Sequence, residues 1–154
     1  MSATLRSEAS QSTATAPRRR GFGRGLKLLI ADDHEDTRLL LRTLLELQQF
    51  KVLEASDGDE VVRLTESERP DVVLMDHSLP VIDGVTATEL IRANKKTADT
   101  LIVFLSGRAE PENQVAARAA GCNDYFVKPL NLDSLVESLD RLLNPASELP
   151  AQPA

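Results

Sequence analysis

Four apolar segments of this chain end in side chains that can do chemistry. KLLIA runs into Asp32-Asp33, VVLM ends on Asp76, TLIVFL ends on Ser106, and DYFV ends on Lys128. Grouped carboxylates repel one another when ionised, so either one keeps a proton or a cation enters, and Mg²⁺ prefers such oxygen ligands. An aspartate beside that ion and a lysine can attack phosphorus, while a hydroxyl can bind a phosphate oxygen. These residue types therefore predict phosphoryl-transfer chemistry with Asp76 as the acceptor, provided that the four segment ends meet.

Each of these residues also has an ordinary structural explanation when taken singly. An aspartate at a strand end commonly forms a turn or caps a helix. Ser106-Gly107 is a normal loop start, and Lys128-Pro129 is a normal strand exit with a solvated lysine. Only their joint occurrence at four expected strand ends favours a functional site.

The rest of the pattern supplies elements that could position these ends. Short apolar segments alternate with amphipathic segments of helical period. The expected strands are 27–31, 51–55, 71–75, 100–106 and 124–128, and the expected helices are 37–50, 60–67, 84–94, 111–121 and 132–143, the last capped by Asn131. This alternation predicts an α/β fold in which helices cover both faces of a five-stranded parallel sheet. Ligands bind such sheets at the carboxyl ends of the strands, where the candidate side chains would meet.

The composition sets limits on function. The 154 residues are 42% hydrophobic and 27% charged, which suits one soluble domain. No apolar run is long enough to span a bilayer and no secretory signal is visible, so we expect a cytoplasmic protein without membrane contact. Cys122 is the single cysteine, which excludes an intramolecular disulfide, and two histidines with one cysteine argue against a zinc site.

Charge is unevenly distributed along the chain. Residues 1–25 contain five arginines and one glutamate (net +4), so the remaining residues carry −10 of the total of −6. Because an acidic body repels phosphates, we expect no nucleic-acid contact except through the Arg-rich residues 18–24. We predict disordered tails at 1–25 and 145–154 around one domain at 26–144. The Arg-rich segment has two interpretations, a solubilising tail or a contact with an anionic surface.

Four motifs resemble those of a known family in order and in spacing. LLIADDHEDTR, VVLMDHSLPVIDG, VFLSGR and DYFVKPL are similar to the motifs of the CheY-like response regulator receiver domains of two-component signalling. The resemblance covers about residues 26–143, and no motif residue is missing. It implies a flavodoxin-like, doubly wound (βα)5 fold with strand order 2-1-3-4-5.

The resemblance also implies a role for each candidate residue. Asp76 would be the phosphoacceptor. Mg²⁺ would be bound by Asp33 directly, by Asp32 mainly through water, by Asp76, and by the backbone carbonyl of Ser78. Lys128 would pair with the acceptor and then with the phosphoryl group, and Ser106 and Tyr125 would form a switch pair. Pro80 and Gly84 match the loop proline and the turn glycine after the acceptor. A packing ring is the other explanation for Tyr125. His77 is expected to point away from the site, and Ser78 and Arg108 to line the approach of water.

The function implied is a signalling switch that catalyses only its own phosphorylation and dephosphorylation. A histidine kinase or histidine phosphotransfer protein would phosphorylate Asp76, and the surface of helix 4, strand 5 and helix 5 would change its affinity for a downstream protein. Residues after 143 leave no room for an output domain, so we expect a stand-alone receiver, monomeric or weakly dimeric. Two alternatives stay open: an aspartyl-phosphate hydrolase, for which no cap segment is visible, and a constitutive protein- or nucleic-acid-binding adaptor led by the Arg-rich tail.

Overall fold

Strands and helices alternate along the whole described chain. The computed structural model describes residues 22–107 and 110–145. The elements are β1 (Lys27–Ala31), α1 (Glu35–Leu47), β2 (Lys51–Ala55), α2 (Gly58–Glu68), β3 (Val72–Asp76), α3 (Gly84–Ala93), β4 (Leu101–Ser106), α4 (Pro111–Ala120), β5 (Asp124–Val127) and α5 (Leu132–Leu143). The predicted alternation is confirmed, and the element ends differ from the prediction by three residues at most.

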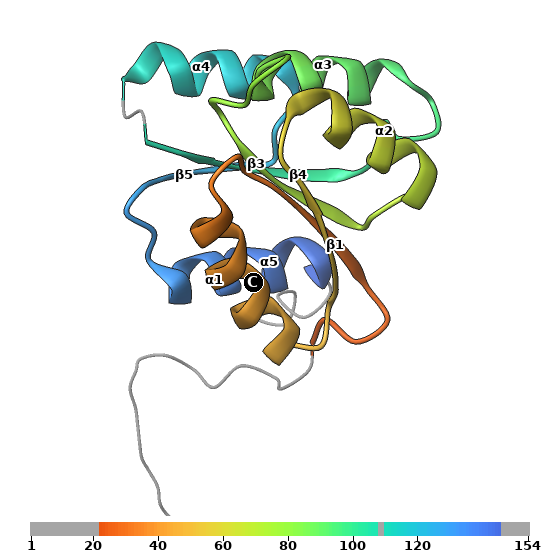
Figure 1. The fold of residues 1–154 in the computed structure, drawn as a ribbon, viewed down its shortest axis with the longest axis vertical. Coiled ribbons are helices and arrows are strands. Elements are labelled where there is room, and N and C mark those ends of the chain that lie inside the picture. The colour runs from red at the N-terminus through yellow and green to blue at the C-terminus, as the bar shows by residue number, and fades with distance from the viewer. Residues whose placement is uncertain (1–21, 108–109, 146–154) are drawn as a thin grey trace, which may run out of the picture.

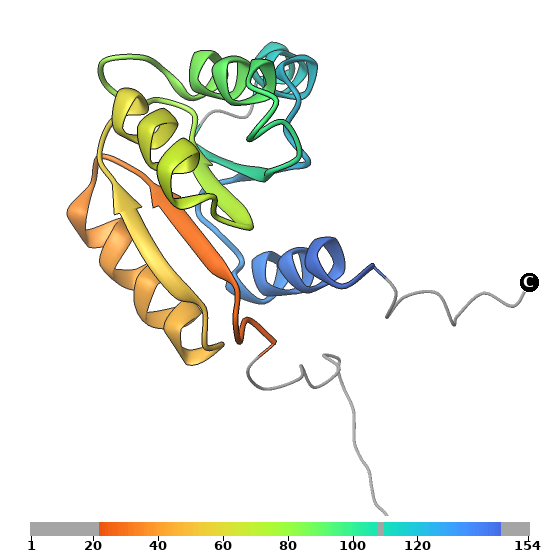
Figure 2. The ribbon, with the colours of Figure 1, turned by 90° about the vertical axis from the view of Figure 1, so that its right-hand side faces the viewer.

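The five strands form one parallel sheet in the order β2-β1-β3-β4-β5, which confirms the predicted fold class. Helices α1 and α5 lie on one face of the sheet, and α2, α3 and α4 lie on the other (Figure 1). The view in Figure 2, turned by 90°, shows α3 and α4 side by side on their face. The order puts β1 beside β3 and β3 beside β4, so the carboxyl ends of these strands are neighbours.

The core explains why the central strands are apolar at every position. Both faces of a parallel sheet are covered, and successive side chains point to opposite faces. Val73 and Met75 pack on the side of α2, α3 and α4, whereas Val72 and Leu74 pack on the side of α1 and α5. Asp76 continues the second series, so its side chain starts on the face of the sheet that α1 and α5 cover.

Side-chain caps fix several helix starts. The Asp83 carboxylate accepts a hydrogen bond from the Thr86 backbone N–H at 2.8 Å at the start of α3. Asn131 accepts from the Ser134 backbone N–H at 3.0 Å, which confirms its predicted role as the cap of α5. Such caps satisfy N–H groups that the helix itself leaves without partners.

The ordered domain begins earlier than the predicted boundary at residue 26. Residues 22–25 form a turn, and the Phe22 ring packs edge-on against Phe50 with 5.4 Å between ring centroids. The Gly23 backbone N–H donates to the Gln48 carbonyl at 2.8 Å. An aromatic side chain that can be buried offsets the entropy of ordering this turn, so the predicted tail at 1–25 is wrong for residues 22–25. The rest of that predicted tail, and residues 146–154, lie outside the described residues. None of the helices in the described part of the chain is long and apolar enough to cross a membrane.

Candidate functional site

The carboxyl ends of β1, β3 and β5 bring two carboxylates and one ammonium group together. Lys128 Nζ donates to Asp32 Oδ2 at 3.1 Å and lies 3.8 Å from Asp76 Oδ2. Asp32 is 1% exposed and Asp76 is 5% exposed. Buried carboxylates are costly unless a positive charge compensates them, and Lys128 provides that charge here.

Lys128 lies closer to Asp32 than to Asp76, although the family resemblance implied Asp76 as its partner. The separation of 3.8 Å from Asp76 is still an ion pair, but the shorter contact goes to the more deeply buried carboxylate. The lysine therefore bridges both acids. Its ammonium group remains near enough to Asp76 to serve an incoming anionic group there.

A third carboxylate and an imidazole border the same site. One ligand atom from each of Asp32, Asp33, His34 and Asp76 lies within 4.8 Å of the others. His34 Nδ1 is 3.1 Å from Asp32 Oδ1 and 3.2 Å from Asp33 Oδ1. Sequence reasoning missed His34, even though its position directly after Asp32-Asp33 was a visible signal.

The donor set fits a hard divalent cation. Mg²⁺ typically takes one or two protein carboxylates and completes its shell with water and phosphate oxygens. Backbone N–H groups help to hold two of the acids in place, that of His34 on Asp32 Oδ1 at 2.8 Å and that of Ser78 on Asp76 Oδ1 at 3.3 Å. The Asp33 side chain is 36% exposed, so one side of the cluster faces solvent. The proposed ligation by the Ser78 carbonyl stays a prediction.

Burial raises the pKa of Asp76 above the usual range of an aspartate. The positive charge of Lys128 opposes this rise, and the neighbouring negative charge of Asp32 adds to it. A carboxylate is a nucleophile only when ionised, so an added positive charge beside Asp76 would lower its pKa and favour the reactive form.

Ser106 and Tyr125 occupy the strands next to Asp76. Ser106 ends β4 and is fully buried, and its carbonyl accepts from the Lys128 backbone N–H at 2.7 Å. Tyr125 is 7% exposed and stacks on Phe104 with ring centroids 6.0 Å apart and planes 9° apart. The Tyr125 ring thus already lies inside the fold, in contact with β4. Whether it moves on phosphorylation stays a prediction.

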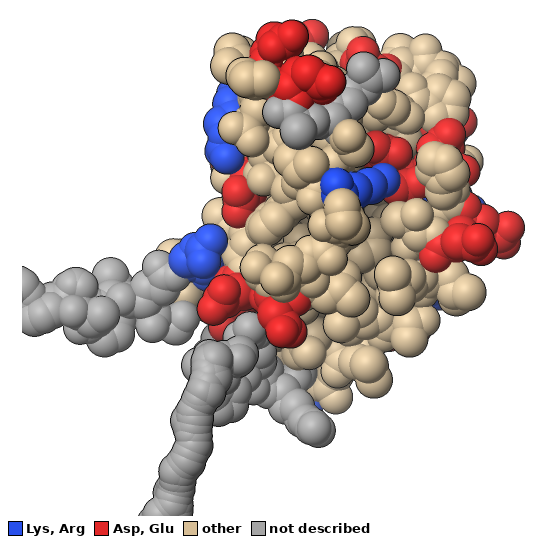
Figure 3. All heavy atoms as spheres, turned by 90° about the vertical axis from the view of Figure 1, so that its left-hand side faces the viewer, with Lys and Arg blue, Asp and Glu red and all other residues tan. Residues whose placement is uncertain are grey.

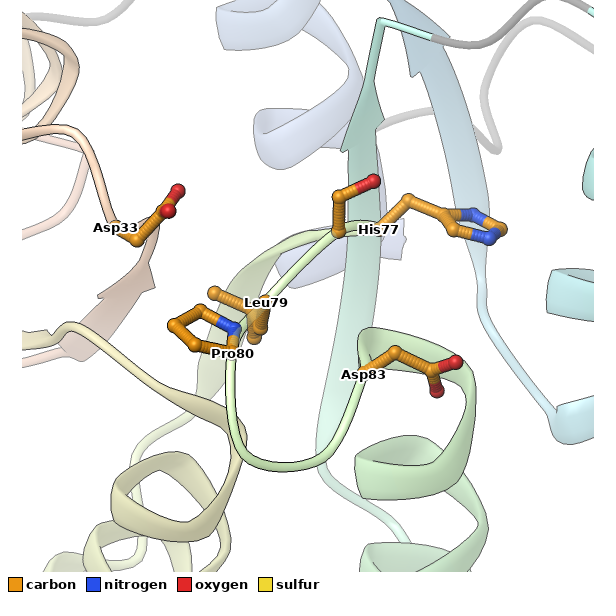
Figure 4. A pocket seen from close by; sticks show the side chains of 6 residues that line it. Asp33, His77, Leu79, Pro80 and Asp83 are labelled. Atoms are coloured by element: carbon orange, nitrogen blue, oxygen red, sulfur yellow. The ribbon is translucent and has the colours of Figure 1, made fainter.

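His77 is a second aromatic neighbour of Phe104. Its imidazole meets the Phe104 ring edge-on, with 5.7 Å between centroids and an interplanar angle of 76°. Figure 4 shows the His77 ring turned away from Asp33, although His77 is among the residues that line the same cavity. The sequence did not predict the contact with Phe104, because nothing in the pattern pairs a loop residue with a particular strand residue.

The loop after Asp76 forms one wall of an open cavity of about 550 Å³. The lining residues are Asp33, His77, Ser78, Leu79, Pro80 and Asp83 (Figure 4). Gly84 closes the loop, because a Cβ there would lie 2.5 Å from the Asp76 carbonyl oxygen. Only glycine permits this approach of α3 to the end of β3, which explains the motif position.

Arg38 is a second residue that sequence reasoning missed. From α1 it donates to the Asp32 carbonyl oxygen at 2.8 Å and to Glu54 Oε1 at 2.8 Å. Burial opposes ionisation of Glu54, but hydrogen bonds from Arg38 and Arg42 outweigh it and lower the pKa of that carboxyl. This network anchors the backbone that carries Asp32.

Charged groups meet where the strands end. Figure 3 shows the face that lies at the left of Figure 1, and acidic side chains lie beside a basic one near the middle of that face. Most of the surrounding surface in this view is uncharged. Arg108, which was expected to line the approach of water, lies outside the described residues.

Comparison with known proteins gives a consistent result. Residues 28–140 match the model of the response regulator receiver domain. Transcriptional regulatory protein PrrA of Mycobacterium tuberculosis is 37% identical over 117 residues, which cover 76% of this chain and 49% of that protein. The chain thus spans about half the length of this curated relative.

Solved structures of receiver domains share the fold. The receiver domain of a sensor histidine kinase from Pseudomonas aeruginosa PAO1, solved with magnesium in its active site cleft, has a TM-score of 0.70 and 30% identity, over 77% of this chain and 96% of that one. A putative response regulator from Chloroflexus aurantiacus has a TM-score of 0.73 and 30% identity, over 77% of this chain and 97% of that one. With its parallel sheet and its acidic cluster at the strand ends, the chain belongs to the response regulator receiver domain family of two-component signalling.

Proposed function

We propose that Asp76 accepts a phosphoryl group from a histidine kinase or histidine phosphotransfer protein, with Mg²⁺, and that this modification switches the binding of a downstream protein. The observation that carries the proposal is the position of Asp76. It is a buried carboxylate at the tip of β3, 3.8 Å from the Lys128 ammonium group and clustered with Asp32 and Asp33. Residues in these positions suit an aspartyl-phosphate intermediate.

The transfer is a displacement at phosphorus. An oxygen of the ionised Asp76 carboxylate forms the new O–P bond, while the P–N bond of the phosphohistidine breaks and its electron pair returns to the donor imidazole. Mg²⁺, held by Asp32, Asp33 and Asp76, would neutralise charge on the phosphoryl oxygens. Lys128 would pair with one of those oxygens, and the Ser106 hydroxyl would donate a hydrogen bond to another.

The switch would run through β4 and β5. Ser106 ends β4, and the stacked rings of Phe104 and Tyr125 connect β4 with β5. A shift of Ser106 toward the phosphoryl group would change the space beside Tyr125, and with it the surface of α4, β5 and α5. Val115 on α4 and Val127 on β5 are exposed apolar residues of that surface and could be covered by a partner.

Intact-mass analysis with phosphoramidate, a small donor with a P–N bond, tests the proposal. Wild-type protein with Mg²⁺ should gain the mass of one phosphoryl group, and Asp76→Asn or an excess of chelator should abolish the gain. Asp83→Asn is a matched control on the same cavity wall and should keep it. Folded wild-type protein that binds Mg²⁺ but gains no mass would favour a constitutive binding module instead.

A further inference from the structure

We propose that Arg38 is a positioning residue for the cation site: it holds the peptide group between Asp32 and Asp33 and thereby sets the affinity of the site for Mg²⁺. The inference rests on the proposed function, because it concerns the same site. A guanidinium group carries a positive charge and has no acceptor atom to offer a metal ion. Arg38 therefore acts on Mg²⁺ only through the residues that it holds.

The Arg38 guanidinium contacts two segments at once. Its Nη1 atom donates to the Asp32 carbonyl oxygen at 2.8 Å, and its Nε atom donates to Glu54 Oε1 at 2.8 Å. The Arg38 side chain is 17% exposed and that of Glu54 is 27% exposed, so water screens this ion pair only in part. A planar guanidinium that is held at two of its donors has few other orientations open to it.

The Asp32 carbonyl belongs to the peptide group that joins Asp32 to Asp33. A peptide group is planar, so fixing its orientation limits the rotation of the backbone on both sides, where the two carboxylates are attached. The Asp32 backbone N–H donates to the Ala55 carbonyl at 3.1 Å. The end of β2 therefore holds both backbone polar groups of Asp32, the N–H directly and the carbonyl through the Glu54–Arg38 pair.

Mg²⁺ binding is sensitive to such positioning. The ion demands near-ideal octahedral geometry, with ligands at about 2.0–2.1 Å, and it gives up water reluctantly. The Asp33 side chain is 36% exposed, so the backbone that carries it has to supply much of its order. If that backbone were free to rotate, part of the binding free energy would be spent on ordering it. Groups that orient metal ligands typically raise metal affinity by about 10- to 100-fold.

The charge of Arg38 acts on Mg²⁺ in the opposite direction from its positioning role. A positive charge near the site repels a cation, so a neutral variant would bind Mg²⁺ more tightly if electrostatics alone mattered. Loss of the hydrogen bond to Asp32 weakens Mg²⁺ binding if positioning dominates. A role in fold stability alone would leave the Mg²⁺ affinity of the folded protein unchanged. The direction of the change in affinity therefore separates the three roles.

The test compares the wild-type full chain with Arg38→Met, which keeps an unbranched apolar side chain but has no donor. Mg²⁺ is titrated and followed by amide chemical shifts, and urea denaturation gives the unfolding free energy of each protein. We expect Arg38→Met to weaken Mg²⁺ binding about 10- to 100-fold. Its phosphorylation by phosphoramidate should slow at limiting Mg²⁺ and recover toward the wild-type rate at saturating Mg²⁺.

Arg42→Met is the matched control on the same helix. Within the described part of the chain, Arg42 donates to Glu46 and to Glu54 but not to Asp32. The substitution thus also removes a positive charge and a hydrogen bond to Glu54. The Arg42 side chain is 44% exposed, and an exposed ion pair contributes little, so the Mg²⁺ affinity should stay within about twofold of the wild type.

The outcomes separate this inference from the proposed function. Mg²⁺ binding by Arg38→Met that equals or exceeds that of the wild type would overturn the inference, and so would an equal loss of affinity in Arg42→Met. Wild-type protein in which Mg²⁺ moves no amide near Asp76 would overturn the proposed Mg²⁺ site itself, whatever the Arg38 variant does.

A second variant covers the case in which Arg38→Met does not fold. Arg38→Lys keeps a positive charge beside Glu54, which favours folding. One ammonium nitrogen cannot reproduce the fork that holds both acceptors, so we expect this variant to bind Mg²⁺ about three- to tenfold more weakly than the wild type. Wild-type affinity in Arg38→Lys would then overturn the inference.

Discussion

Asp76 must satisfy two opposing requirements. It must be ionised to attack phosphorus, but burial beside Asp32 raises its pKa, which favours the neutral form. Lys128 relieves only part of this conflict, because its shorter contact goes to Asp32. The site therefore costs stability in its ionised, cation-free form, as functional clusters of like charge generally do.

The destabilisation caused by the ionised, cation-free site predicts how the free energy of unfolding depends on pH in the presence of a chelator. Because the folded protein holds the Asp76 proton more tightly than the unfolded chain, the stability contributed by this group is present below about pH 4, the ordinary aspartate pKa, and is lost as pH rises through the raised pKa. Asp76→Asn should therefore unfold at a higher urea concentration than wild type at neutral pH, and the difference should shrink toward pH 4.

The control for this prediction is Glu89→Gln, which removes an exposed acid from α3 and should change the unfolding free energy by less than about 0.5 kcal/mol. An Asp76→Asn variant that is less stable than wild type at neutral pH would show that Lys128 stabilises the ionised acid more than burial destabilises it.

One arginine links the end of α3 to the segment that precedes β4 and to the segment that follows α4. Arg92 donates to the carbonyl oxygens of Ala98 and Thr100 before β4 and to that of Gly121 after α4. It also donates to the Asn123 side chain. Arg92→Ala would leave these acceptors without this donor, so we expect a loss of about 2–4 kcal/mol of unfolding free energy.

Urea denaturation measures the Arg92 effect, and Arg118→Ala provides the comparison. The Arg118 side chain is 48% exposed and lies 3.7 Å from Asp124, so its removal should cost less than about 1 kcal/mol. Similar losses of unfolding free energy in the two variants would argue against Arg92 as the main link between these segments.

The loop after β3 contains a strained residue. Val81 has φ of 74°, a conformation that a β-branched side chain rarely adopts, and it is 76% exposed. Val81→Gly should relieve strain of about 1–3 kcal/mol, less about 0.5–1 kcal/mol for the added flexibility of the unfolded chain. We therefore expect the free energy of unfolding, measured by thermal or urea denaturation, to increase by about 1 kcal/mol.

The same change in a helix should have the opposite sign. Val115 is exposed on α4, where glycine is a poorer helix former than valine, so Val115→Gly should destabilise the protein. Destabilisation by Val81→Gly as well would indicate that the Val81 side chain makes a favourable contact that outweighs its strain.

The burial and the order of the strands explain which features of the fold and the site could be predicted from the sequence. Strands such as Val72–Asp76 are buried on both faces, so they are continuous apolar runs that end visibly at a polar residue. Chain order then brings Asp32, Asp76 and Lys128 together through the topology of parallel sheets. Choices between neighbouring partners were not predictable, such as the shorter contact of Lys128 with Asp32, because they depend on differences of less than 1 Å.

Contacts between segments that lie far apart in the sequence could not be predicted from it either. Arg38 is an ordinary polar position of an amphipathic helix, and only the packed structure places it on the Asp32 carbonyl and on Glu54. Phe22 stands in an Arg- and Gly-rich segment that is typical of disorder, and one aromatic contact with Phe50 orders its turn. In both cases the deciding interaction is long-range in sequence.

At the scale of the whole molecule, the proposed switch should be visible far from Asp76. Amide hydrogen exchange of protein phosphorylated with phosphoramidate should differ from that of the unmodified protein in α4 and β5, because Ser106 and the Phe104–Tyr125 stack connect the site with them. Helix α2 and strand β2 lie outside this connection and should keep their exchange rates. Differences confined to residues next to Asp76 would contradict the switch.

Locating the modified residue tests directly whether Asp76 carries the phosphoryl group. Protein treated with phosphoramidate and Mg²⁺ is reduced with borohydride, which converts an aspartyl phosphate into homoserine, and is then digested and sequenced by mass spectrometry. We predict homoserine at position 76 alone, and none in the Asp76→Asn variant. Homoserine at position 32 or 33, or a phosphoryl group retained on His34 or His77, would mean that Asp76 is not the acceptor.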